Sequence, residues 1–189
     1  MTAPQASPAA ATAARRIALQ MLEERGRGAV LVGVARVDAA LEHLLQAVMS
    51  QSPSRDDALF RPDGPLGSLG AKVALANRLQ LIDGPVERAL GVLRKLRNAF
   101  AHSAESASLT DPAHSSRLAE VYVEARANPL WTPLETVLAA QPASPRSPLE
   151  PALRDYILLI TILVAFLEAT AQQLRPYQPQ VVMRFQGHP

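Results

Sequence analysis

The sequence predicts an all-α protein, a single bundle of about six helices, and three observations lead to this fold class. Apolar residues make up 48% of the chain, enough for a core, while aromatic residues make up only 4% and Ala and Leu are abundant, as in helical proteins. Several segments repeat apolar residues every three or four positions, the period of a helix with one buried face. The length of 189 residues suits one domain with tails.

The expected organisation is a disordered tail over residues 1–14, a helical domain over residues 15–175 and a second tail over residues 176–189. The first tail consists mainly of Ala, Pro, Ser and Thr and carries no charged side chain, a composition that buries too little surface to order itself. A Pro-rich loop is expected over residues 142–151 and a turn-rich loop over residues 50–68. Apolar periodicity predicts helices over residues 15–25, 29–49, 69–81, 85–102, 112–128 and 152–174.

The last of these segments is apolar nearly all the way round over residues 156–167. This run is shorter than the roughly 18 continuous apolar residues that a membrane span requires. We therefore expect a buried central helix or a contact between two copies of the chain, and no membrane insertion.

Composition excludes several kinds of site. The chain has no cysteine, which removes disulfides, thiol catalysis and cysteine-based zinc sites and is compatible with a reducing cytoplasm. The net charge is only +2, so no extended DNA-binding surface is indicated. No metal and no cofactor is expected, because no cofactor motif stands out and the four histidines lack ligand spacing: His43, His102, His114 and His188.

The helix expected over residues 85–102 carries polar residues in a pattern that helix packing alone does not require. At about 100° per residue, Arg97 falls on the apolar side of this helix, together with Leu93 and Phe100. A guanidinium keeps its proton, so a buried arginine needs a carboxylate or carbonyl oxygens as partner. We expect Asp38, at the border of the apolar face of residues 29–49, to be that partner. Asn98 and His102 follow Arg97 and project away from the apolar stripe.

The spacing Arg97-Asn98-x-x-x-His102 resembles the R-x4-6-H motif of the HEPN superfamily of helical domains. Five segments in order are similar to the mannitol operon repressor family within it, and together they extend from about Gly26 to Ser103. They are GAVLVG at 28–33, DAALE at 38–42, DGPLGSLGAK at 63–72, LQLID at 79–83 and LRNAFAH at 96–102.

This resemblance implies a cytoplasmic regulator of transcription. No recognition helix with a base-reading set is apparent, so we expect the regulator to act through a protein partner rather than by sequence-specific DNA contact. A homodimer formed through apolar helix surface is also expected.

The HEPN resemblance leaves two alternatives open. The first is a metal-independent ribonuclease, with His102 as general base, Arg97 stabilising the phosphorane and Asn98 orienting the phosphate or the histidine. RNA would then be the substrate. The second is a purely structural role, with Arg97 as a buried tie and His102 at a helix end, where a cation suits the helix dipole. On an unbroken helix Arg97 and His102 point about 140° apart, which opposes the catalytic alternative.

Overall fold

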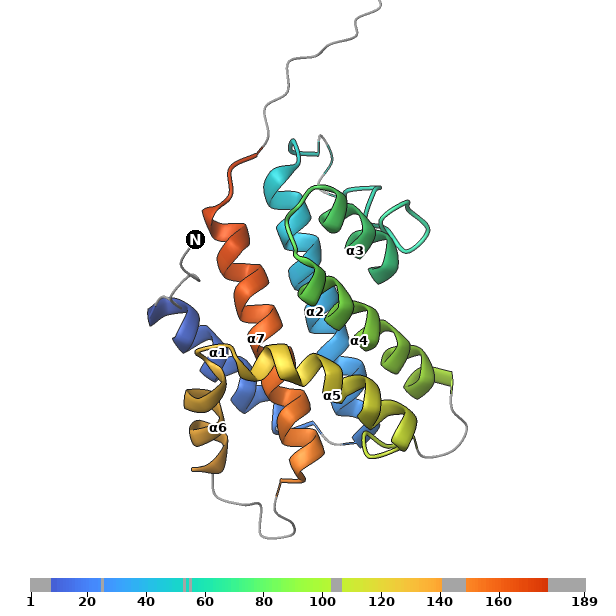
Figure 1. Cartoon of the computed structure of the whole chain (residues 1–189). Coiled ribbons are helices and arrows are strands. Elements are labelled where there is room, and N and C mark those ends of the chain that lie inside the picture. Colours follow the sequence, from blue (N-terminus) through green and yellow to red (C-terminus); the bar gives the residue numbers. More distant parts are fainter. Residues whose placement is uncertain are drawn as a thin grey trace, which may run out of the picture.

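The computed structural model describes residues 8–24, 26–52, 54, 56–102, 107–140 and 149–176. These residues form α-helices connected by turns and loops, which confirms the all-α prediction (Figure 1). The helices are α1 (Pro8–Met21), α2 (Gly26–Val48), α3 (Leu69–Arg78), α4 (Gly84–His102), α5 (Pro112–Arg126), α6 (Trp131–Ala139) and α7 (Pro151–Gln173).

Helix α7 is the centre of the bundle. Its residues from Asp155 to Ala165 are all buried, and α1, α2, α5 and α6 pack around it (Figure 1). The prediction of a buried central helix is therefore confirmed, and its apolar surface is used inside the chain. None of the described helices is both long enough and apolar enough to cross a lipid bilayer.

The contact between α2 and α7 depends on a glycine. A Cβ atom at Gly33 would lie 2.7 Å from the Tyr156 hydroxyl oxygen and 3.1 Å from a carbon of Ile160. The same hydroxyl donates a 3.0 Å hydrogen bond to the carbonyl of Val30, one turn before Gly33 on α2. The tyrosine thus satisfies its buried polar atom only because the glycine leaves room for the ring.

The first helix corrects the expected N-terminal tail. Residues 8–14 belong to α1, and Ala14 is fully buried against the rest of the core. Alanine has the highest helix propensity, and its small side chain lets α1 approach α7 closely. The sequence analysis considered only the lack of charged and large apolar residues and therefore predicted a tail. Residues 1–7, residues 177–189 of the expected C-terminal tail, and most of the Pro-rich loop at 142–151 lie outside the described residues.

The described residues form one helix more than the approximate count of six. Helix α6 begins at Trp131, between the helices expected over residues 112–128 and 152–174, where apolar periodicity predicted none. Pro133 lies in the first turn of α6, where a proline needs no amide hydrogen and fits the helix. Helix α3 is shorter than expected, because the chain turns through Gln80, whose φ of 55° lies in the left-handed region.

The close approach of α2 and α7 makes Gly33 and Gly91 a matched pair for mutation. Gly33→Ala should lower the free energy of unfolding by about 1–3 kcal/mol, because the added methyl overpacks the Tyr156 contact. Gly91→Ala in α4 should raise it by about 0.5–1 kcal/mol, because the added methyl meets nothing within 4 Å and alanine favours the helix. Urea denaturation of both variants checks this, and equal stabilities would contradict the packing described.

Candidate functional site

The Arg97, Asn98 and His102 side chains are all exposed at the C-terminal end of α4. The Arg97 guanidinium donates a long 3.4 Å hydrogen bond to the Asn98 side-chain oxygen. The helix continues unbroken to His102, so Arg97 and His102 leave it in directions about 140° apart. Exposure of Asn98 and His102 agrees with the sequence analysis, whereas the predicted burial of Arg97 was wrong.

The expected pair between Asp38 and Arg97 is also corrected. Asp38 lies 3.0 Å from the ammonium of Lys72 on α3. The reason is register along the two antiparallel helices: Arg27 of α2 donates to the carbonyl of Ala101 near the end of α4. Asp38 lies eleven residues further along α2, about 16 Å, while Arg97 lies only four residues back along α4, about 6 Å. The two side chains are therefore at different levels of the bundle.

The buried cation of the described residues is Lys72. Its side chain is 4% exposed and its ammonium lies 2.7 Å from a carboxylate oxygen of Glu42 as well as 3.0 Å from Asp38. Burial of the ammonium lowers the pKa of Lys72, but hydrogen bonds and charge from Glu42 and Asp38 outweigh this, and the net pKa is raised above its usual value. The triad of Asp38, Glu42 and Lys72 ties α3 to α2 through charge.

A signal for Lys72 is present in the sequence. Lys72 is one of only two lysines, and it shares the apolar face of α3 with Leu69, Val73 and Ala76, at spacings of three and four residues. Asp38 and Glu42 are one turn apart and thus offer two carboxylates on one side of α2. A lysine on an apolar helix face, with two carboxylates awaiting a partner, predicts such a triad.

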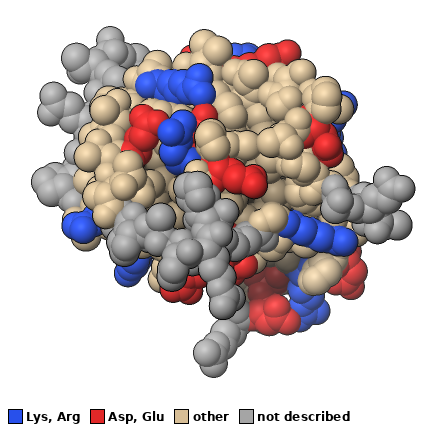
Figure 2. Space-filling model, turned by 90° about the horizontal axis from the view of Figure 1, so that it is seen from below, with Lys and Arg blue, Asp and Glu red and all other residues tan. Residues whose placement is uncertain are grey.

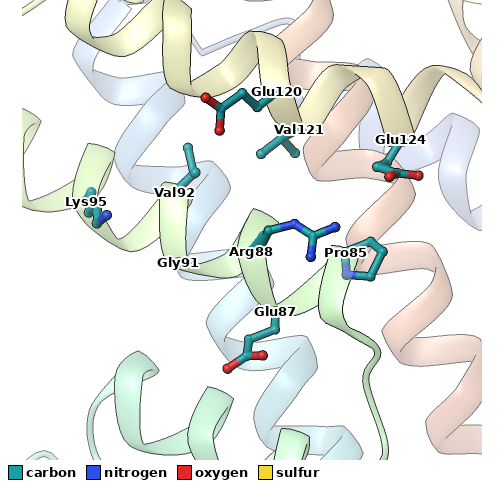
Figure 3. A pocket seen from close by; sticks show the side chains of 9 residues that line it. All are labelled: Pro85, Glu87, Arg88, Gly91, Val92, Lys95, Glu120, Val121 and Glu124. Carbon is teal, nitrogen blue, oxygen red and sulfur yellow. The ribbon is translucent and has the colours of Figure 1, made fainter.

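A surface groove lies between α4 and α5. It has a volume of about 420 Å³, and Val92 of α4 and Val121 of α5 face each other at its floor (Figure 3). The groove is lined by Pro85, Glu87, Arg88, Gly91, Val92 and Lys95 from α4 and by Glu120, Val121 and Glu124 from α5. The sequence analysis did not predict this groove, because the spacing of apolar residues in α5 shows which side of the helix is buried but not which helix lies next to it.

The charges of the groove are unpaired across it. Arg88 and Lys95 stand on the α4 side, and Glu120 and Glu124 stand on the α5 side. None of these four exposed side chains has an ion pair within 4.0 Å among the described residues, whereas Glu87 accepts a 2.7 Å hydrogen bond from Asn77. The groove thus has a basic wall, an acidic wall and a small apolar floor.

Basic and acidic side chains are also interspersed elsewhere. On the face seen in Figure 2, the described Lys and Arg side chains alternate with Asp and Glu, and no broad patch of one sign forms. No group of three His, Asp or Glu side chains among the described residues is arranged to hold a metal ion.

The Lys72 triad leads to a prediction for stability. Lys72→Met should destabilise the fold by about 1–3 kcal/mol, less than for a fully buried pair, because the Asp38 and Glu42 side chains stay 33% and 28% exposed. Lys95→Met, at the other and exposed lysine, should change the stability by less than about 0.5 kcal/mol.

The pH dependence of this difference tests the charge. A raised folded-state pKa means that the Lys72 contribution is fully present below the unfolded value of 10.5 and is lost as the pH rises through the higher folded value. Burial also raises the pKa of Tyr122 and Tyr156, but their ionisation weakens wild type and variant alike and cancels in the comparison. Denaturation at pH 7 and at about pH 11.5 is the measurement, and an unchanged difference would contradict the ionic origin.

Comparison with known proteins gives one similarity of fold. No protein-family model and no curated protein matches the chain. A chain of the solved "X-ray structure of the MtlR-HPr complex from Escherichia coli" is similar, with a TM-score of 0.57 and 19% sequence identity. The match covers 83% of this chain and 99% of that chain. At this identity the match shows a shared fold, which agrees with the resemblance to the mannitol operon repressor family and leaves the HEPN resemblance untested.

Proposed function

We propose that the protein is a cytoplasmic regulator of transcription of the mannitol-repressor type, which acts by binding a protein partner. The observation that carries this proposal is the fold shared with a chain from a complex of MtlR with HPr. The sequence resemblance over residues 26–103 points in the same direction, and it rests on the order of five short motifs rather than on the arrangement of the helices.

The charge distribution supports a protein rather than DNA as the direct partner. The chain carries 19 basic against 17 acidic side chains, and phosphate binding by a protein normally depends on a clear basic surface. Mixed charges around a small apolar area are instead typical of the rim and centre of a protein interface. The expected homodimer stays a prediction. The apolar surface of α7, for which a contact between two copies of the chain was one alternative, is buried inside the chain.

Binding of HPr tests the proposal. Isothermal titration calorimetry of the purified chain with HPr should give a saturable one-to-one heat change with a dissociation constant in the micromolar range typical of transient regulatory complexes. An unrelated helical protein of similar size is the control and should give only heat of dilution. The absence of a heat change at an HPr concentration of about 100 µM, which is 100-fold above a dissociation constant of about 1 µM, would overturn the proposal.

A second candidate function is the metal-independent ribonuclease of the HEPN type. The observation in its favour is that Arg97, Asn98 and His102 are exposed, and no carboxylate among the described residues lies within 4.0 Å of Arg97. The motif is thus not used as a buried tie. Against it stands the divergence of Arg97 and His102 on an unbroken helix, so that a reacting phosphate would need groups from elsewhere.

RNA cleavage separates the two candidates. We expect no cleavage of a mixed single-stranded RNA pool by the wild-type protein in the presence of a chelator, because one chain does not bring Arg97 and His102 together. Products with cyclic-phosphate ends that disappear in Arg97→Ala and His102→Ala, and persist in the exposed control His43→Ala, would establish the ribonuclease instead.

A further inference from the structure

The groove between α4 and α5 is lined by charged side chains that form no ion pair with any described residue. Arg88 and Lys95 are two turns apart on one wall, about 10 Å, and Glu120 and Glu124 are one turn apart on the other, about 6 Å. Because α4 and α5 form an antiparallel pair joined by a short connection, these walls run alongside each other for the length of the groove (Figure 3). Val92 and Val121 give the floor between them an apolar strip.

Gly91 leaves room for a partner to approach α4 closely at the groove. A glycine inside a helix costs about 1 kcal/mol relative to alanine. Gly33 has a reason within the chain, the ring of Tyr156, and Gly70 lies against Arg94, but a Cβ atom at Gly91 would meet nothing within 4 Å. The missing side chain therefore opens the groove toward solvent and permits a close approach of a backbone from outside.

The chemistry of the walls selects a protein helix as the occupant. The lining has three carboxylates and two cations, so the phosphates of a nucleic acid would be repelled along the acidic wall. Both walls are helical, and their backbone amides are already bonded within α4 and α5. An extended peptide would leave its own amides unpaired against the valine floor, whereas a helix satisfies them internally.

We propose that the groove between α4 and α5 is the docking site for one helix of a partner protein, with an apolar ridge flanked by acidic residues on one side and basic residues on the other. The ridge packs on Val92 and Val121 next to Gly91. The acidic flank pairs with Arg88 and Lys95, and the basic flank pairs with Glu120 and Glu124. This inference specifies the surface on which the proposed regulator binds its partner and the charge pattern of that partner. It rests on the proposed function only for the biological role of the groove.

Three synthetic helical peptides test the charge pattern directly. All share a leucine ridge and differ in their flanks, which are mixed, wholly acidic or wholly basic. Fluorescence anisotropy should show the mixed-flank peptide binding the wild-type protein at least tenfold more tightly than either single-sign peptide. The direction of the bound helix need not be known in advance, because turning the helix end for end exchanges its flanks and the mixed-flank peptide can bind in the direction that places its acidic flank on Arg88 and Lys95.

Two variants make the test specific. In Glu120→Lys/Glu124→Lys both walls are basic, so the wholly acidic peptide should become the tightest ligand. In Gly91→Leu the groove is filled, so the mixed-flank peptide should lose at least tenfold in affinity while the melting temperature does not fall. Equal binding of the three peptides, binding of none, or an unchanged preference in the charge variant would each overturn the groove as a helix site.

The titration with HPr distinguishes the docking site from the proposed function. If the peptides behave as described and HPr does not bind, the docking site stands and the proposed function fails. If HPr binds and the peptides show no preference, the partner uses another surface and this inference fails. A loss of HPr affinity in Gly91→Leu would support both proposals, because it would show that HPr binds at the groove.

Discussion

The packing of α2 on α7 sets the positions of the other helices. Gly33 allows the Tyr156 ring to lie against α2, and the hydroxyl of that ring bonds to Val30 on the same helix. Since α7 is buried along most of its length, the other helices take their places around this pair: α1, α5 and α6 cover α7, and α3 and α4 cover α2 (Figure 1). The surface of α4 and α5 is thereby held on a rigid support, as a recognition surface requires.

Charged residues are divided between two roles that the sequence alone does not separate. Lys72 is withdrawn from water and compensated by Asp38 and Glu42, an arrangement that fixes α3 on α2. Arg88, Lys95, Glu120 and Glu124 remain in water across an open groove. A buried charge must find its partner within the chain, whereas an exposed unpaired set remains available for a partner outside it.

Helix periodicity predicted most of the architecture, because each long helix buries one face or, for α7, nearly its whole surface. It failed where the signal is not periodic: the start of α1 depends on alanine propensity and tertiary packing, and α6 begins at a proline-containing turn. For the candidate site, exposure of Asn98 and His102 followed from the angular position on α4. The partner of Asp38 could not be predicted in this way, because the angular position of a residue on its helix does not say how far along the bundle the residue lies. The register of α2 against α4 places Arg97 at another level, and Lys72 lies beside Asp38 instead.

Methyl NMR during a titration with HPr is the sharpest test of whether a protein partner binds at the groove between α4 and α5. Val92 and Val121 lie in the groove, while Val123, 71% exposed on α5, lies outside its lining and serves as an internal control. Binding at the groove predicts that the methyl signals of Val92 and Val121 shift with saturation and that the Val123 signals shift far less. Shifts confined to Val123, or no shift of any of the three, would contradict it.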